Sequence, residues 1–521
     1  MTEDQYIELC EACDTVLLAE DSTLERVAIP WLHVIREHPD VLAKYNDVFE
    51  PVNAAKKIVQ RAWQVFRSKI YWIKQIKGFL LSRGKFWYGP EDFSRTIDVL
   101  FVSHLINENQ AGKHQDFYFA GLADDLIANG FSVAIAMINH TGKYAKPMIQ
   151  KWDGSLVTRI IFSESLPISQ ELELRRRLKV ESYHLNQCAK IGKNGFTRRI
   201  FTRASEEVVT GGTLSILRLN LQINTLVKKL QPNAIVITHE GHSWERIAFT
   251  AARNAQPHIR CFGYQHSALF RLQHSIRRNL APQFNPDQIL TSGIISKNQL
   301  KNSRDLKDIP ISVLGTNRAI LDDHSKVEDQ HSISRSGKIE NAWCLVLPEG
   351  FVSECYYLFE FSLACALKNP EINFLWRLHP LVSFKSLMLN NPKLRNLPRN
   401  IELSFATLKE DIARCRWALY RGTTAIVQAV GAGLRPLYLQ LPGEMSIDPF
   451  YDLKDWRVTV RSVSEFQNII TADSNCTVDV LKSEAMNAKK YCNDFFVPLN
   501  SKILIDSLKS ITSSLRDIDN T

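Results

Sequence analysis

Short apolar runs alternate with amphipathic stretches through most of the chain. Seven runs of four to seven residues lie at 97–103, 132–137, 157–162, 234–238, 259–263, 288–292 and 311–314. Six more lie at 343–347, 374–378, 401–404, 417–420, 436–439 and 457–460. Runs of this length, separated by helical patterns, predict parallel strands that are joined by crossover helices.

The pattern divides the chain into two strand-bearing parts flanked by helices. The predicted parts are a helical N-terminal region without a strand at 1–92, a first domain at 93–320, a linker at 321–340, a second domain at 341–476 and C-terminal helices at 477–521. Within the first domain we expect helices at 116–129 and through most of 168–230. The sequence therefore predicts an α/β protein with two Rossmann-like, doubly wound domains that face a cleft.

The composition is that of a globular protein, with 45% apolar and 23% charged residues among 521. No stretch of eighteen apolar residues predicts a transmembrane helix, and the N-terminus has no apolar signal-peptide core. The ten cysteines are scattered, and Cys10 and Cys13 form a lone CxxC pair that is weak as a zinc motif. We therefore expect a protein of the reducing cytoplasm.

The net charge of +9 is concentrated in one segment. Residues 51–90 contain no acidic residue, nine basic ones and three tryptophans. A basic helix with aromatic side chains can lie on an anionic membrane surface, which would place the protein peripherally at the inner face of the cytoplasmic membrane. The alternative is a surface helix whose aromatic side chains dock on the next domain. No nucleic-acid-binding motif accompanies the segment, so we do not expect a nucleic acid partner.

Two strand ends in the second half predict a phosphate site. The run 374–380 closes on His379, and the strand 417–420 leads into Gly422, Thr423 and Thr424 at the start of a predicted helix. Free N–H groups, hydroxyls and the helix dipole favour an anion there, and His379 adds a donor. The alternative for the two threonines is an ordinary helix cap.

Glu349 and Gly350 follow the first strand of the same half. Glycine permits close approach of a ligand to the backbone, and a carboxylate can accept hydrogen bonds from sugar hydroxyls. We expect this pair to contact a ribose or a transferred sugar.

In the first half, Glu240 follows the strand 234–238 and is the candidate general base. Alternatively, Glu240 caps the next helix or pairs with Arg246. The flanking His239 and His242 compete for the base role, and without a third ligand they predict no zinc site.

Further polar residues follow neighbouring strands of the first half. Gln265 and His266 could bind a sugar or nucleotide, or satisfy buried loop carbonyls, and Asn107 lies in a candidate acceptor loop. No Asp-x-Asp cluster ends a strand, so we expect neither a metal nor another cofactor.

Together these residues resemble a known family. The motifs are Glu240-Gly241, Trp244-Glu245-Arg246, Gly263-Tyr264-Gln265-His266, Leu347-Pro348-Glu349-Gly350, Arg377-Leu378-His379-Pro380 and Gly422-Thr423-Thr424-Ala425. Their ordered set over 96–470 resembles the bacterial surface carbohydrate biosynthesis proteins and, more distantly, the GT-B sialyltransferases and Kdo transferases of capsule and lipopolysaccharide assembly.

The resemblance implies an inverting, metal-independent glycosyltransferase that uses a nucleotide sugar and a surface polysaccharide or lipid-linked acceptor. It implies Glu240 as the base, with His379, Thr423 and Thr424 as ligands of the donor phosphate. The chain has Glu-Gly where sialyltransferases have an Asp-containing motif, and Thr-Thr where serine is usual. The donor nucleotide therefore stays open among CMP, UDP, GDP and dTDP. A polyol-phosphate transferase that uses a CDP-alditol, and an inactive assembly protein of the same pathway, are the alternatives.

Overall fold

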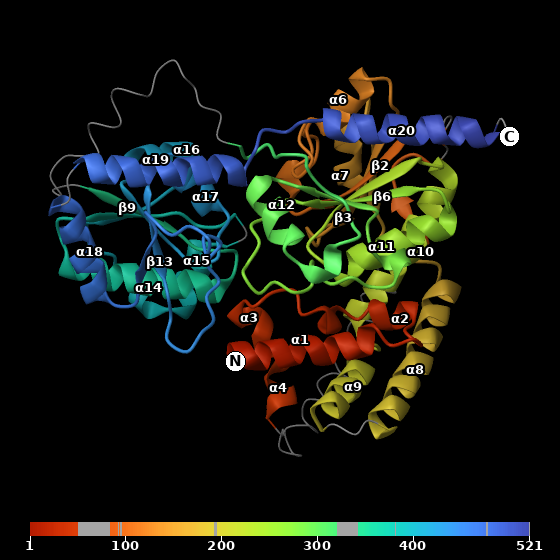
Figure 1. The fold of residues 1–521 in the computed structure, drawn as a ribbon, viewed down its shortest axis with the longest axis horizontal. Coiled ribbons are helices and arrows are strands. Elements are labelled where there is room, and N and C mark those ends of the chain that lie inside the picture. The colour runs from red at the N-terminus through yellow and green to blue at the C-terminus, as the bar shows by residue number, and fades with distance from the viewer. Residues whose placement is uncertain are drawn as a thin grey trace.

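Two α/β domains lie side by side, with a helical layer below their junction (Figure 1). The computed structural model describes residues 1–50, 84–91, 93, 96–191, 195–319, 342–380, 382–475 and 478–519. The predicted linker at 321–340 and most of the basic segment, at 51–83, lie outside the described residues.

The first domain is built on an eight-stranded sheet in the order β1-β4-β3-β2-β5-β6-β7-β8. Its strands are β1 Trp87–Tyr88, β2 Val99–Leu105, β3 Val133–Asn139, β4 Thr158–Phe162, β5 Ala234–Thr238, β6 Arg260–Gln265, β7 Gln288–Thr291 and β8 Ile311–Val313. Every pairing from β4 to β8 is parallel, and β1 is antiparallel to β4.

The second domain has a six-stranded parallel sheet in the order β11-β10-β9-β12-β13-β14. Its strands are β9 Trp343–Leu347, β10 Asn373–Trp376, β11 Ile401–Leu403, β12 Trp417–Tyr420, β13 Arg435–Leu439 and β14 Val458–Val460. The apolar runs form these strands because both faces of the sheet are covered by helices, which leaves strand side chains such as Trp376 and Leu419 fully buried.

In both sheets the parallel strands start in the middle, continue outward to one side and then return to continue on the other side; in the first sheet the short antiparallel β1 lies at the edge beyond β4. The strand order therefore reverses between β2 and β5 and again between β9 and β12, and ligands of open parallel sheets bind at the carboxyl end of such a reversal. The predicted fold class, two Rossmann-like doubly wound domains, is confirmed.

Two local predictions were wrong. The region before residue 93 does contribute a strand, because Trp87 and Tyr88 pair with Phe162 and Ile161, but two residues are too short for a recognisable alternation. The helix expected at 116–129 begins only at residue 122. The Asp116 carboxylate accepts the N–H groups of Tyr118 and Phe119 and holds a turn there.

Helices cover both sheets and form the layer below them. In the N-terminal region these are α1 Glu3–Leu17, α2 Leu24–Val27, α3 Pro39–Leu42 and α4 Asn46–Phe49. The first domain contains α6 Leu122–Ala128, α7 Lys146–Ile149, α8 Ile168–Ile191, α9 Gly195–Glu207, α10 Gly211–Leu230, α11 Ser243–Ala255 and α12 Ile294–Lys301. The remainder are α14 Val352–Lys368, α15 Phe384–Asn390, α16 Leu408–Arg414, α17 Ala425–Gly431, α18 Val463–Asn475, α19 Val478–Phe495 and α20 Lys502–Asp519. Among the described helices, none is long and apolar enough to cross a membrane.

The N-terminal helices are an integral part of the first domain. They share an apolar core with α8, α9 and α10, in which Leu9, Val16 and Leu178 are buried. The guanidinium of Arg26, fully buried, donates to Glu181 of α8 at 2.8 Å. Because such a buried pair is costly to break, it ties the N-terminal region to the helical layer.

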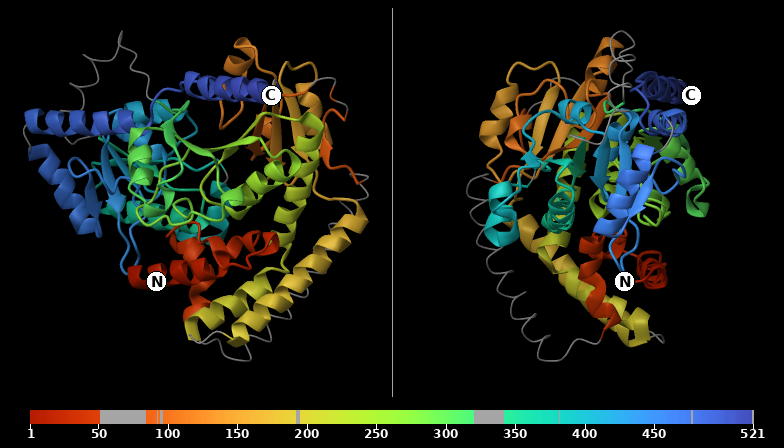
Figure 2. Two further views of the ribbon diagram at one scale, coloured as in Figure 1. Left: turned by 45° about the vertical axis from the view of Figure 1, so that its right-hand side comes forward. Right: turned by 90° about the vertical axis from the view of Figure 1, so that its left-hand side faces the viewer.

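The C-terminal helices connect the two domains. Helix α19 packs on the second domain, and α20 crosses to the first, as Figure 1 and the left view of Figure 2 show. Between them, Val497 exchanges backbone hydrogen bonds with Ser292 and Thr316 of the first domain, at 3.1 and 2.8 Å. Leu504, Ile505 and Leu508 then enter the core of the first domain.

We predict that Leu504→Ala lowers the free energy of unfolding by about 2–5 kcal/mol, since it removes a fully buried side chain and leaves a cavity. Denaturant titration measures the change, and Lys509→Ala on an exposed position of the same helix is the control. Equal stabilities for the two variants would show that α20 is not held by this contact.

Candidate functional site

The candidate residues gather where the strand order reverses. In the first sheet, the Nε2 atom of His104 on β2 lies 3.0 Å from the hydroxyl of Thr238 at the end of β5. In the second sheet, Gly422 after β12 lies so close to Glu349 after β9 that any side chain at 422 would collide with its carboxylate. Each domain thus brings polar residues of separate strand ends together at its own crevice.

The two crevices face each other across the domain boundary. The backbone N–H of Ala268, which follows β6, lies 3.5 Å from the hydroxyl of Thr424, which follows β12. The neighbouring Ser267 donates its hydroxyl to the Glu240 carboxylate. The candidate base and the candidate phosphate turn are therefore linked through two adjacent residues of one loop.

Glu240 is enclosed by the residues predicted around it. Its Oε2 lies 3.6 Å from Nε2 of His242, and its Oε1 lies 4.0 Å from Nε2 of His266. The Glu240 side chain keeps 21% of its surface exposed, so a ligand can still reach it. The ring of Tyr118 meets the edge of His266 at 4.7 Å and closes one side.

Glu240 and His242 shift each other's pKa. Burial alone would raise the pKa of Glu240, but the nearby rings of His242 and His266 and the Ser267 hydroxyl outweigh it and hold that pKa well below its usual range. Burial alone would lower the pKa of His242, but the carboxylates of Glu240 and Glu245 outweigh it and raise that pKa. Both shifts favour the charged pair. Burial lowers the pKa of His266, which favours a neutral ring.

Glu245 holds the loop that carries Glu240, and the sequence motifs did not assign it this role. Its carboxylate accepts the N–H groups of Glu240, Gly241 and His242 at 2.9, 2.7 and 2.9 Å. Gly241 has a φ of +88° and lies against the backbone of residues 275–276, so only glycine fits there. The signal in the sequence was a Glu three residues after the helix N-cap, which is typical of a capping box.

His239 does not lie in the site. Its side chain is completely buried, and its Nδ1 lies 3.0 Å from the Glu245 carboxylate. The ring also fills the space above Gly263 on the next strand. The buried His239 ring therefore supports the loop that carries Glu240. Because a completely buried ring cannot reach a substrate, the base role predicted as an alternative for His239 does not fit. Glu240 does not pair with Arg246, whose guanidinium donates to Asn285 and to backbone carbonyls.

Gln265 and Asn107 are occupied by local structure. The Gln265 side chain is fully buried and donates to the carbonyl of Ser267, which is the structural alternative considered for it. Asn107 is exposed and caps a short 3-10 turn by accepting the N–H of Asn109 at 3.0 Å. The structure gives neither of them a contact with Glu240.

In the second domain the predicted residues follow the strand order. His379, after β10, lies against Gly350, where an added side chain would come within 3.0 Å of the His379 ring. Burial lowers the pKa of His379. Thr423 accepts the N–H of Ala425 at 3.4 Å, and Thr424 is the N-cap residue of α17, a helix of seven residues.

Arg36 is a member of this site that sequence analysis missed. It comes from the N-terminal region, and its guanidinium lies 3.4 Å from Oε2 of Glu349. The same group lies 5.3 Å from the ring of Phe270 in the first domain and 5.6 Å from that of Phe351 in the second. A cation therefore stands between the domains, beside the carboxylate that touches the phosphate turn.

His38 lies beside Arg36 and between two buried carboxylates. Its Nδ1 accepts the N–H of Asp40 at 3.2 Å, which assigns the hydrogen of the neutral ring to Nε2. Nε2 lies 3.7 Å from Glu349 and 3.6 Å from Glu354. Burial lowers the pKa of His38 to about 3 and raises those of both carboxyls, with that of Glu354 at about 7. Burial thus favours uncharged forms of all three groups.

The described part of the chain contains one group of potential metal ligands, Asp21, His184 and Cys188. Its surroundings do not favour a metal ion. Arg26 donates to both carboxylate oxygens of Asp21, at 3.0 and 3.3 Å. Its guanidinium also lies 3.2 Å from Nδ1 of His184. A fixed positive charge at this place repels a metal ion.

Comparison with known proteins yields structural similarities only. No protein-family model and no curated protein matches the chain. Among solved structures, the glycotransferase of kitacinnamycin is 9% identical, with 80% of this chain and 100% of that chain covered and a TM-score of 0.47. The UDP-GlcNAc 2-epimerase from Neisseria meningitidis bound to UDP-GlcNAc is 13% identical, with 80% and 100% covered and a TM-score of 0.43. MurG of Acinetobacter baumannii is 11% identical, with 79% and 99% covered and a TM-score of 0.44. Every one of these scores is below 0.5, so the fold assignment rests on the two sheets themselves.

We predict that Glu240→Gln lowers the pKa of His242, because the neutral amide no longer stabilises the imidazolium. The folded-state pKa of His242 is raised, so its contribution to stability is present below about pH 6.5 and is lost at higher pH. The folded-state pKa of Glu240 is lowered, so the contribution of its carboxylate to stability is present above about pH 4.5 and is lost at lower pH.

The destabilisation by Glu240→Gln should therefore be larger at pH 5.5 than at pH 9. NMR titration of the imidazole and denaturant titration at both pH values measure these effects. Glu8→Gln at an exposed position is the control. An unchanged His242 titration in Glu240→Gln would contradict the pairing.

Proposed function

We propose that the protein is a glycosyltransferase that moves a sugar from a nucleotide-activated donor to an acceptor hydroxyl. The contact between Ala268 and Thr424 is the observation that carries this proposal. These residues are 156 positions apart, and their contact supports the proposal because Ser267, next to Ala268, hydrogen-bonds to the Glu240 carboxylate. A base facing an anion-binding turn is the arrangement that sugar transfer from a phosphate requires.

The donor phosphates bind, in this proposal, at Thr423, Thr424 and His379. The hydroxyls and backbone N–H groups of the turn donate to the phosphate oxygens, and the His379 ring adds a donor from the neighbouring strand. Gly350 lets the His379 ring pack directly against the backbone after β9, which holds the ring at this strand end.

The charged form of Glu349 would repel an anion bound at this turn, because its carboxylate lies against Gly422. Burial raises the pKa of Glu349, which makes its neutral form easier to reach. In the protein without a bound nucleotide sugar, the Arg36 guanidinium, 3.4 Å away, balances the charge of the Glu349 carboxylate. When a nucleotide sugar binds, the same guanidinium can balance the charge of its phosphate. Glu349 is then free to accept a hydrogen bond from a sugar hydroxyl.

The proposed reaction is a single displacement. Glu240 takes the proton of the acceptor hydroxyl, the acceptor oxygen forms a bond to the anomeric carbon, and the bond from that carbon to the phosphate oxygen breaks. The electron pair leaves with the nucleotide, whose negative charge is stabilised by the turn, His379 and Arg36. Attack opposite to the leaving group inverts the anomeric centre, and no step requires a metal ion.

The substrates remain those that the sequence resemblance implies. We propose CMP, UDP, GDP or dTDP sugars as donors, and a surface polysaccharide or its lipid-linked precursor as the acceptor. A cytoplasmic location and attachment to the inner membrane surface through the basic segment also stay predictions, because residues 51–83 lie outside the described part of the chain.

We predict that His379→Ala, Thr423→Ala and Arg36→Gln each weaken binding of the donor nucleotide by about 1–3 kcal/mol through loss of one hydrogen bond or ion pair. A thermal-shift panel of CMP, UDP, GDP and dTDP selects the nucleotide, and calorimetry measures its affinity. Arg271→Gln, at an exposed arginine paired with Glu3, is the control. Wild-type affinity in all three variants would refute the proposed donor site.

We predict that Glu240→Gln retains donor affinity but loses roughly 10²-fold or more in turnover, because the amide cannot accept the proton. Steady-state kinetics with the selected nucleotide sugar measure turnover, and calorimetry measures donor binding. Near-normal turnover would transfer the base role to His242 or His266, the two imidazoles beside Glu240.

A further inference from the structure

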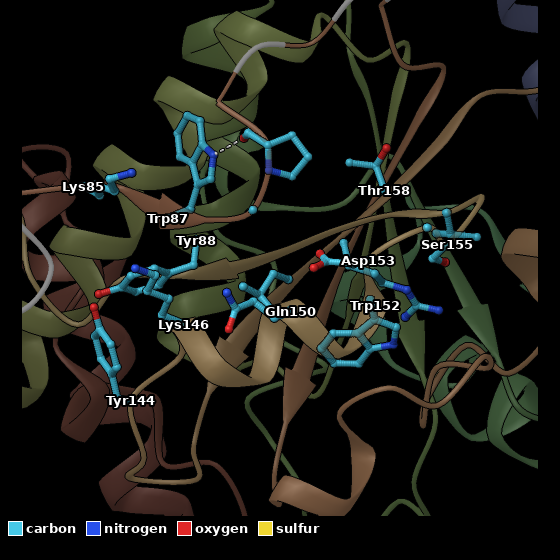
Figure 3. Close-up of a pocket in the computed structure, with 16 residues that line it drawn as sticks. Lys85, Trp87, Tyr88, Tyr144, Lys146, Gln150, Trp152, Asp153, Ser155 and Thr158 are labelled. Carbon is cyan, nitrogen blue, oxygen red and sulfur yellow. Dashed lines mark hydrogen bonds between the residues drawn. The ribbon is translucent and has the colours of Figure 1, made fainter.

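A cavity of about 670 Å³ opens beside β1, the edge strand of the first sheet (Figure 3). Its walls come from β1, the start of β4, helix α7 and the following 3-10 turn Gln150–Trp152. The volume is within the range of small-molecule sites, about 300–1,000 Å³. The proposed function gives this cavity no role.

Basic side chains outnumber acidic ones in the lining. Lys85, Lys146 and Arg159 contribute positive charge, and Asp153 contributes the one acidic side chain. Lys85 is paired with Glu91, outside the cavity. Lys146 is exposed and forms no ion pair with any residue that the structure describes. The lining therefore favours an anionic ligand.

Arg159 is the most informative of these residues. It is only 5% exposed, and its guanidinium donates to the carbonyl of His114 at 2.6 Å and lies 5.7 Å from the ring of Trp152. No carboxylate of the described residues lies within ion-pair distance, and its Nε has no hydrogen-bond partner among them. Asp116 and Asp124 act on this guanidinium only from beyond ion-pair distance, so its burial remains costly, and a bound anion would offset that cost.

The remaining lining suits a saccharide. The aromatic residues Tyr88, Tyr144 and Trp152 share one core beside the cavity, and Gln150, Ser155 and Thr158 offer amide and hydroxyl groups. Figure 3 shows Gln150 between the side formed by Tyr144 and Lys146 and the side formed by Trp152. Sugars present apolar C–H faces and hydroxyl edges, so amphipathic rings together with short polar side chains match both.

One loop connects this cavity with the candidate site. Between β3 and α7, His140 hydrogen-bonds to His104 at 2.9 Å, and His104 in turn contacts Thr238 beside the Glu240 loop. Four residues later, Tyr144 lines the cavity. The loop between β3 and α7 therefore contacts both the candidate site and the cavity.

We propose that the cavity is a binding subsite for an acidic saccharide, whose carboxylate contacts Arg159 while its ring packs on the aromatic wall. Lys146, on the opposite side of the cavity, adds positive charge. The proposal rests on the proposed function for the saccharide class, and it extends that function. The subsite would hold a distal acidic sugar of the acceptor, outside the place where transfer occurs.

Calorimetry on the full chain tests the proposal with tetragalacturonic acid, neutral maltotetraose and inorganic phosphate as probes. Tetragalacturonic acid should bind with an affinity that falls with added salt, and maltotetraose roughly tenfold more weakly or not at all. Lys146→Gln combined with Gln150→Ala, both at exposed positions, should weaken tetragalacturonic acid binding roughly tenfold. Arg159→Gln should do the same if its melting temperature shows that it folds.

Lys151→Gln is the matched control, because Lys151 is exposed in the same 3-10 turn and does not line the cavity. The proposal is overturned if tetragalacturonic acid does not bind, if maltotetraose binds equally well, if phosphate binds as tightly as the saccharide, or if the exposed double variant binds like the control. Nucleotide affinity should be the same in all variants. A wild-type protein that binds tetragalacturonic acid but no nucleotide would refute the proposed function and leave the subsite standing.

Discussion

The constraint on which the site depends is that two parallel sheets present their carboxyl edges to each other. In each sheet the strand order reverses once, so the loops after β2 and β5, and after β9 and β12, diverge and leave their polar groups accessible. Because Ala268 and Thr424 meet at this boundary, the two crevices form one site. The Glu240 carboxylate and the threonine turn are far apart in the sequence. They come near each other only because the two domains pack together.

Buried charges then fix the details of this arrangement. The Glu245 carboxylate accepts hydrogen bonds from three backbone N–H groups and contacts the His239 ring. These interactions hold the loop that carries Glu240 in place. On the opposite side, Arg36 and His38 insert between the domains and contact Glu349. The helical N-terminal region, which the family resemblance leaves out, is thus a structural part of the candidate donor site.

The sequence predicted all parallel strands, because short apolar runs alternate with longer amphipathic stretches, as strands buried on both faces do when helices join them. It also grouped Glu240 with His242 and His266, since these follow neighbouring parallel strands. It could not predict Arg36 beside Glu349, because these residues are 313 positions apart and no periodicity records such a contact. It placed His239 in the site because strand alternation does not reveal that a side chain at a strand end turns inward under a Glu carboxylate.

In the proposed function, one nucleotide binds between the domains at the threonine turn. The decisive experiment is a crystal structure of the protein with the nucleotide chosen by the thermal-shift panel. We expect phosphate oxygens within hydrogen-bond distance of Thr423, Thr424 and His379, with Arg36 turned from Glu349 toward the phosphate. A nucleotide bound elsewhere, with the Glu349 carboxylate still against Gly422 and still paired with Arg36, would contradict it.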